Sequence, residues 1–257
     1  MSDSDESTAE IYDRAAQRWV RREPTSLSDF TGRPPVFDLC GDVRGARIAD
    51  LGCGEGYCAR ILVEEMGAGA VEGIDISAKM VEAAQGAVEG DSRYRFEVGD
   101  ATKPPFEAGA FDLVVAVFVY NYLSIEGTAA SFAEVHRLLK PGGSFVFAVP
   151  HPAFPFIKRN KNRPFFFDFP ADSGYFSARN ARNFGEISRI DGVHLPVEMT
   201  HKTFQDYFEA LRGAGFAALP ELRELGVTAE HRRRDPDFFG PVDDIPLHLA
   251  LRVEKDL

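Results

Sequence analysis

The chain has 257 residues, 44% hydrophobic and 27% charged, which is the composition of one globular domain with a full core. Its formal net charge of −11 opposes binding to nucleic acid or anionic membranes, because both depend on basic surface, and favours a small-molecule partner. The apolar runs are too short to cross a membrane, and "MSDSDESTAE" does not resemble a secretory signal, so we expect a cytoplasmic protein.

The N-terminal segment, residues 1–44, is expected to be helical. In "YDRAAQRW", Tyr12, Ala16 and Trp19 share one helical face. Two interpretations stay open. The helix either closes as a lid over a bound ligand, or it is an ordinary amphipathic helix packed on the core.

Residues 45–150 alternate strand-like and helix-like segments in the rhythm of a parallel sheet. Strands are predicted at 47–52, 70–76, 94–100, 111–119 and 144–150. Helices are predicted at 56–66, after the N-cap Ser77, and before "KPGG". The fold class is therefore α/β, with a Rossmann-like, doubly wound and mostly parallel sheet that the C-terminal strands extend to seven.

Residues 151–200 show no sustained period, yet eight of the 22 phenylalanines lie between Phe154 and Phe184, so we predict an ordered aromatic flap inserted after the fifth strand. Residues 201–257 predict a helix capped by Thr203, then strands at 217–225 and 245–253 that form a hairpin-like pair at one sheet edge. All four parts form one domain, 1–257. For the oligomeric state, a monomer and a homodimer both stay open.

The stretch "ADLGCGEGY", residues 49–57, places Gly52, Gly54 and Gly56 between a strand and a helix, where this fold binds nucleotides. The loop also carries Asp50 and Glu55. Two carboxylates would repel a pyrophosphate, and the spacing lacks the last glycine of GxGxxG. The loop therefore favours a ligand without phosphate that offers a cationic group.

The same stretch resembles the first motif of the class I S-adenosylmethionine-dependent methyltransferases. "GIDIS" at 73–77, "VGDAT" at 98–102, "FDLVVAVFV" at 111–119 and "LLKPGG" at 138–143 resemble the later motifs, in order. More loosely, the whole chain resembles the small-molecule group that contains the type 11, toxoflavin N-methyltransferase-like and quinone methyltransferases. The implied fold is the seven-stranded class I methyltransferase fold.

This resemblance implies S-adenosylmethionine as cofactor and S-adenosylhomocysteine as product. Asp75 would accept the ribose hydroxyls, and Asp100 with Ala101 would receive adenine. Asp50 and the carbonyl of Phe118 would approach the ammonium group. The full predicted cofactor set is Tyr12, Trp19, Asp50, Gly52, Cys53, Gly54, Gly56, Asp75, Ile76, Met80, Asp100, Ala101 and Phe118.

Acceptor residues are expected at the ends of the fourth and fifth strands and in the flap. His151 is the predicted general base, although a histidine before proline is also a common turn residue. Tyr122 is a second catalytic candidate, and Tyr122, His151, Tyr175 and His194 are the predicted acceptor-binding residues. The basic run "KRNKNR" at 158–163 is either an anion contact or a solvated face.

The predicted function is methyl transfer to nitrogen or oxygen, less readily to carbon, of a small aromatic or heteroaromatic metabolite of secondary metabolism. Three alternatives stay open: an RNA-directed methyltransferase, a nicotinamide-dependent oxidoreductase, and a non-catalytic protein that binds the cofactor. The three cysteines contain no CxxC pair, so we expect neither a disulfide framework nor a metal site.

Overall fold

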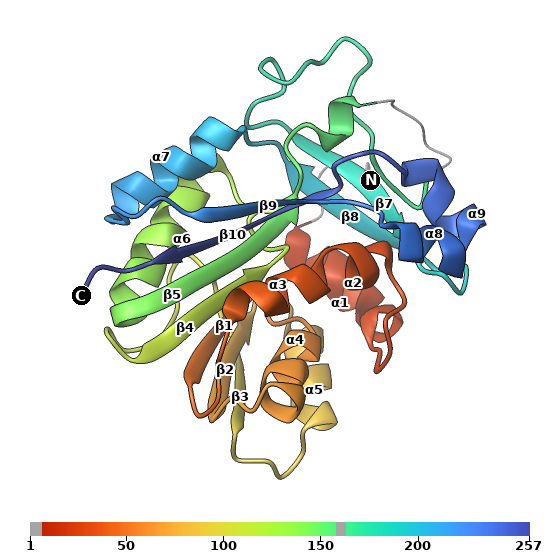
Figure 1. Cartoon of the computed structure of the whole chain (residues 1–257). Helices are drawn as coiled ribbons and strands as arrows, with labels where there is room; N and C mark the ends of the chain where they lie inside the picture. The colour runs from red at the N-terminus through yellow and green to blue at the C-terminus, as the bar shows by residue number, and fades with distance from the viewer. Residues whose placement is uncertain (1–6, 158–162) are drawn as a thin grey trace.

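The computed structural model describes residues 7–157 and 163–257 (Figure 1). Its central sheet has seven strands in the order β3-β2-β1-β4-β5-β10-β9. The strands are β1 (Arg47–Leu51), β2 (Ala70–Asp75), β3 (Tyr94–Val98), β4 (Phe111–Val117), β5 (Leu139–Pro150), β9 (Glu221–Leu225) and β10 (His248–Glu254). Neighbours among β1 to β5 pair in parallel, whereas β10 is antiparallel to both β5 and β9. The predicted α/β fold with a mostly parallel seven-stranded sheet is confirmed.

Helices cover both faces of this sheet. One face holds α3 (Arg33–Cys40), α4 (Tyr57–Arg60) with the π-helix η2 (Ile61–Glu65), and α5 (Ala78–Ala87). The other holds α6 (Ile125–Leu138) and α7 (Phe204–Ala214). Because β5 lies between the two layers, every residue from Phe145 to Val149 is buried, as expected for an unbroken apolar run.

Local capping explains where two of these helices begin. Ser77 accepts a hydrogen bond from the Met80 amide at the start of α5. Thr203 forms a capping box with Asp206 at the start of α7, and Gly215 ends that helix in the left-handed region. These beginnings agree with the sequence prediction.

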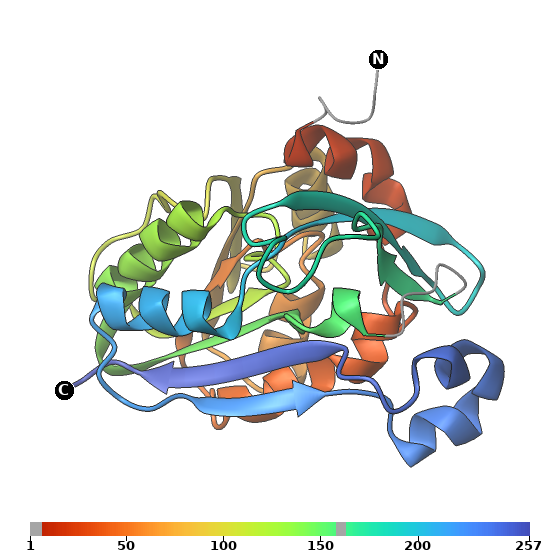
Figure 2. The ribbon, with the colours of Figure 1, turned by 90° about the horizontal axis from the view of Figure 1, so that it is seen from above.

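The segment after β5 forms a second, antiparallel sheet of β6 (Phe165–Phe167), β7 (Arg182–Ser188) and β8 (His194–Thr200), after the short helix η3 (Phe154–Phe156). In Figures 1 and 2 this sheet lies across the end of the molecule where the central parallel strands terminate. Its phenylalanines pack with α2 (Leu27–Thr31) and with Phe239 in a third hydrophobic cluster. The basic run at 158–163 lies outside the described residues except for Arg163.

The N-terminal helix α1 (Thr8–Trp19) packs against α5 and β8. Glu198 of β8 accepts hydrogen bonds from Thr8 and from Arg182, which fastens the helix to the second sheet. The strands β9 and β10 pair antiparallel at the sheet edge, but their connection is helical and not a hairpin turn. It contains α8 (Ala229–Arg234), α9 (Pro236–Phe239) and η4 (Gly240–Val242).

Within the ranges 7–157 and 163–257, the helices are all too short or too polar to span a bilayer.

Candidate active site

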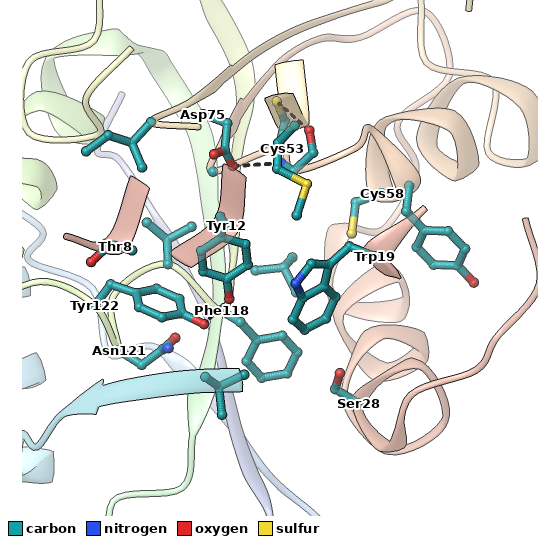
Figure 3. A pocket seen from close by; sticks show the side chains of 18 of the residues that line it. Thr8, Tyr12, Trp19, Ser28, Cys53, Cys58, Asp75, Phe118, Asn121 and Tyr122 are labelled. Atoms are coloured by element: carbon teal, nitrogen blue, oxygen red, sulfur yellow. Dashed lines mark hydrogen bonds between the residues drawn. The ribbon is translucent and has the colours of Figure 1, made fainter. Parts of the chain in front are cut away.

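A cavity lies at the carboxyl ends of the parallel strands, between the N-terminal helices and the second sheet (Figure 3). This is where open α/β sheets bind ligands, because the strand order reverses between β1 and β4. Thirteen of the predicted site residues line it: Tyr12, Trp19, Asp50, Gly52, Cys53, Gly54, Asp75, Ile76, Met80, Asp100, Ala101, Phe118 and Tyr122.

The glycine loop is shaped by positive backbone φ angles. Gly52 has φ +72°, and a Cβ there would lie 2.2 Å from Val119 Cγ2, so no side chain fits. Gly54 has φ +55° with open space beside it. Gly56 does not line the cavity. It has φ +81°, and a Cβ there would press on Ala84 and Phe96, so its role is close packing of the helix beneath.

Asp75, at the end of β2, holds the loop in place. One carboxylate oxygen accepts the Gly54 amide at 2.9 Å and the other accepts the Ser77 amide at 2.9 Å. Burial raises the pKa of Asp75, and the two amides partly oppose that effect. A carboxylate offers about four acceptor sites, so Asp75 can still accept a hydrogen bond from a hydroxyl group beside these amides.

At the outer part of the cavity the residues suit an aromatic ring. Asp100 is exposed, and its Oδ1 accepts the Thr102 amide at 2.8 Å. Ile76 also lines the cavity, and 50% of this residue is exposed, so it offers an apolar surface to a ligand. A flat base placed against Ile76 would meet the carboxylate of Asp100 at its edge.

At the inner part, two buried groups of opposite charge line the cavity. Asp50 is 1% exposed and its Oδ2 has no hydrogen-bond partner among the described residues. Burial and the nearby Asp75 raise the pKa of Asp50 to about 7, against the opposing influence of Arg33. Arg33 binds Asp29 through one terminal nitrogen at 2.8 Å. Its buried Nε has no hydrogen-bond partner among the described residues.

Glu55 corrects part of the sequence argument. We interpreted its carboxylate as a charge that repels phosphate, but Arg21 binds it at 3.0 Å and Arg60 binds it at 2.7 Å. Both arginines are largely buried. The charge of Glu55 is therefore compensated, and the preference for a cationic group rests on Asp50 alone.

Phe118 follows β4 with φ +62°, a conformation that is unusual for a bulky residue. Its amide donates to the Ala148 carbonyl at 2.8 Å, which keeps the turn fixed. Its ring lies 5.3 Å from the Arg33 guanidinium and packs against His248. Phe118 and Asp50 both line the cavity, and the contact of the Phe118 carbonyl with an ammonium group stays a prediction.

Aromatic residues of α1 and of the loop after β4 close the cavity. The hydroxyls of Tyr12 and Tyr122 are hydrogen-bonded, and Trp19 stacks on Tyr12 with 5.6 Å between ring centroids. Figure 3 shows the three rings together, with Asp75 and Cys53 across the cavity. This face of α1 borders the cavity, and its action as a lid stays a prediction.

The structure does not bring three other predicted residues to the cavity. The His151 Nε2 bonds Glu224 at 2.9 Å and its Nδ1 accepts the Ala153 amide at 3.1 Å, which is the turn role that we left open. The Tyr175 hydroxyl accepts the Phe204 amide at 3.1 Å. His194 is exposed on β8 and bonds Glu186.

Sequence reasoning missed several residues that line the cavity: Arg33, Asn121, Phe165, Phe167, Ile187, Val197 and His248. Five lining residues have a buried polar atom without a partner among the described residues: Trp19 Nε1, Arg33 Nε, Asp50 Oδ2, Asn121 Oδ1 and His248 Nδ1. Native proteins satisfy nearly all such atoms, so this grouping indicates that a ligand completes the site. An arginine before two prolines and an inward histidine in the last strand are the only sequence signals for Arg33 and His248.

Comparison with known proteins agrees with this geometry. The family described as "Methyltransferase domain" matches residues 48–143. Nocamycin O-methyltransferase of Saccharothrix syringae is 33% identical over 223 residues, which is 84% of this chain and 72% of that protein. Demethylmenaquinone methyltransferase of Lactococcus lactis is 35% identical over 49% of this chain and 51% of its own length.

A solved S-adenosylmethionine-dependent methyltransferase from Mesorhizobium loti superposes with a TM-score of 0.64 at 28% identity, covering 86% of this chain and 96% of the other. The chain spans about half the length of several curated relatives that it matches, for example 53% of a Haemophilus influenzae protein and 51% of the Lactococcus lactis enzyme. A doubly wound sheet with this glycine loop and these aspartates defines a nucleoside-binding α/β protein. The chain belongs to the S-adenosylmethionine-dependent methyltransferases.

Proposed function

We propose that this protein transfers a methyl group from S-adenosylmethionine to an oxygen or nitrogen of a small aromatic molecule. One observation is the main support for S-adenosylmethionine as the cofactor. Asp50 and Arg33 line the same cavity, and a buried carboxylate oxygen of the one and a buried guanidinium nitrogen of the other have no partner within residues 7–157 and 163–257. They are suited to the ammonium and the carboxylate of an amino acid, respectively.

The remaining residues fit the rest of that cofactor. Asp75 would take the ribose hydroxyls, and Ile76 with Asp100 would hold adenine. S-adenosylmethionine supplies an activated methyl group on a sulfonium, so the protein has mainly to align an acceptor with it. Alignment alone gives effective molarities of roughly 10⁵–10⁸ M.

The acceptor half of the cavity is apolar and aromatic. The second sheet supplies Phe165, Phe167, Ile187 and Val197, and Phe118 also lines the cavity. Such walls suit a flat, uncharged molecule. The names of the relatives, one an O-methyltransferase of nocamycin and one a methyltransferase of demethylmenaquinone, support a small-molecule acceptor. The net charge of −11 is unfavourable for an RNA acceptor.

Binding tests the cofactor assignment first. S-adenosylmethionine, S-adenosylhomocysteine and NADH are titrated calorimetrically against the wild type, Asp75→Asn and the exposed control Glu82→Gln. We expect both sulfur nucleosides to bind, Asp75→Asn to weaken them about tenfold or more through a lost charge-assisted hydrogen bond, and the control to match the wild type. Binding of NADH instead would support the oxidoreductase alternative.

Transfer is tested with methyl-labelled S-adenosylmethionine and a panel of phenols, hydroxyquinones, N-heteroaromatics and bulk RNA, read by mass. Labelled small aromatics support the proposal. Label on RNA supports an RNA-directed enzyme, and binding without label in any class supports a non-catalytic cofactor-binding protein.

A further inference from the structure

His248 is the first residue of β10 and lines the acceptor half of the cavity. Its ring lies between two aromatic walls, 4.9 Å from the centroid of Phe118 and 5.6 Å from that of Phe165. It is 1% exposed. A histidine in such surroundings needs a partner for each ring nitrogen.

The hydrogen bonds around His248 define its tautomer. Thr31 Oγ1 donates its single proton to the Leu27 carbonyl at 2.9 Å. The same oxygen lies 3.0 Å from His248 Nε2, where it has only lone pairs left to offer. With the Thr31 proton on the Leu27 carbonyl, Nε2 carries the ring proton and Nδ1 carries a lone pair.

That lone pair has no partner among the residues that the structure describes. Burial, with smaller contributions from Arg33 and His151, lowers the pKa of His248 to about 3, so the imidazole is neutral at ordinary pH. An unpartnered buried acceptor is unfavourable, and a bound hydrogen-bond donor would remove that cost. The cavity thus offers a hydrogen-bond acceptor inside an otherwise apolar half.

We propose that His248 is a catalytic residue whose Nδ1 accepts a hydrogen bond from a hydroxyl group of the aromatic acceptor and then takes its proton. This inference rests on the proposed function. The hydroxyl oxygen forms the new bond to the methyl carbon, and the electrons of the broken carbon–sulfur bond stay on sulfur. The proton, which becomes strongly acidic as the carbon–oxygen bond forms, passes to Nδ1 and then to water as the product leaves. Thr31 is a positioning residue.

Two variants of similar shape distinguish the contribution of His248 Nδ1 from that of Nε2. His248→Gln places an amide near the Nε2 position, so the Thr31 bond can persist while the Nδ1 acceptor is lost. His248→Asn places an oxygen near the Nδ1 position and loses the Thr31 bond. His136→Gln is the matched control, because His136 packs on Phe216 in another part of the molecule.

The first measurement needs no turnover. 1-Naphthol and its methyl ether are titrated into protein saturated with S-adenosylhomocysteine. We expect the wild type and His136→Gln to prefer the naphthol about 3–10-fold, the effect of one net hydrogen bond. His248→Gln should lose this preference and His248→Asn should keep part of it. An unchanged preference in His248→Gln, or none in the wild type, overturns the proposal.

The second measurement is kcat over substituted naphthols of rising acidity. His248→Gln should lower kcat by about 10²–10⁴-fold for the least acidic hydroxyls, and the loss should shrink as the hydroxyl ionises on its own. A loss that is the same across the series contradicts proton transfer to Nδ1. If the wild type methylates no acceptor, the proposed function fails, while the naphthol preference still decides the assignment of His248.

Discussion

Replacing Asp50 by asparagine should stabilise the free protein while it weakens cofactor binding. The side chain is 1% exposed, its Oδ2 has no partner among the described residues, and its pKa is raised to about 7. The folded protein therefore holds a carboxyl that is unfavourable to ionise. Asparagine has nearly the same shape and no charge.

The pKa shift sets the magnitude. A rise from 3.8 to about 7 means that folding binds a proton between these pH values, so stability falls as pH rises through that window and stays low above it. The loss is complete near pH 8 and amounts to about 4 kcal/mol. Because the asparagine amide still has polar atoms to satisfy, at about 1–3 kcal/mol, the net gain at pH 8 should be about 1–3 kcal/mol.

The assay is urea unfolding of the free wild type and Asp50→Asn at pH 8 and pH 5, with the exposed Asp38→Asn as control. At pH 5 the folded wild type already has a neutral Asp50, so the advantage of the variant should decrease by about 3 kcal/mol, or 1.4 kcal/mol for each pH unit below 7. In parallel, S-adenosylhomocysteine should bind the variant about 10–100-fold more weakly, because a charge-assisted contact with the ammonium is lost. A variant that is less stable at pH 8, or equally altered at both pH values, would refute this account of Asp50.

Three further predictions follow from particular contacts. Asp29→Ala removes the carboxylate that holds buried arginine side chains and should destabilise the protein by about 3–5 kcal/mol in urea unfolding; a loss below 1 kcal/mol would contradict it. Gly52→Ala should displace the loop from Val119, because the new Cβ would lie 2.2 Å from Cγ2, and should weaken S-adenosylhomocysteine at least about tenfold by calorimetry, whereas unchanged affinity would mean that the loop adapts. Tyr12→Phe removes the hydroxyl bonded to Tyr122 and should raise the cofactor dissociation rate in stopped flow about 3–10-fold, and an unaltered rate would count against a closed lid.

The central sheet was predictable because its signals are local. β1, β4 and the second half of β5 are short, mostly apolar runs, although β5 begins at Leu139 and so includes the "KPGG" at which we expected a break. Ser77 and Thr203 mark helix starts through their own side chains. The second sheet gave no such signal. In β7 the burial is mostly intermediate, so its residues show little contrast between buried and exposed positions. The helices between β9 and β10 likewise bury few residues and have little periodicity.

The site, like the fold, contains residues that the sequence placed correctly and residues that it did not. Asp50, Asp75 and Asp100 each lie at or just after the carboxyl end of a strand, so topology alone brings them to one cavity, and the sequence was sufficient to predict that position. His151 has the same kind of position but turns to Glu224, because both of its nitrogens have partners near the β5 terminus. A strand-end position thus predicts which region a residue occupies, and the available hydrogen bonds decide which way its side chain faces.

The acceptor half of the cavity is assembled from several elements of the chain, which is why no sequence motif describes it. Its walls come from α1, from the neighbouring strands β6, β7 and β8, and from β10, and each element contributes one to three side chains. Apolar walls of this kind constrain shape only weakly, since many side chains of similar volume would serve. Specific recognition must then depend on the few polar atoms among them. Asn121 Oδ1 and His248 Nδ1 lack partners among the described residues, so we expect the cavity to favour molecules that present hydrogen-bond donors on an aromatic frame.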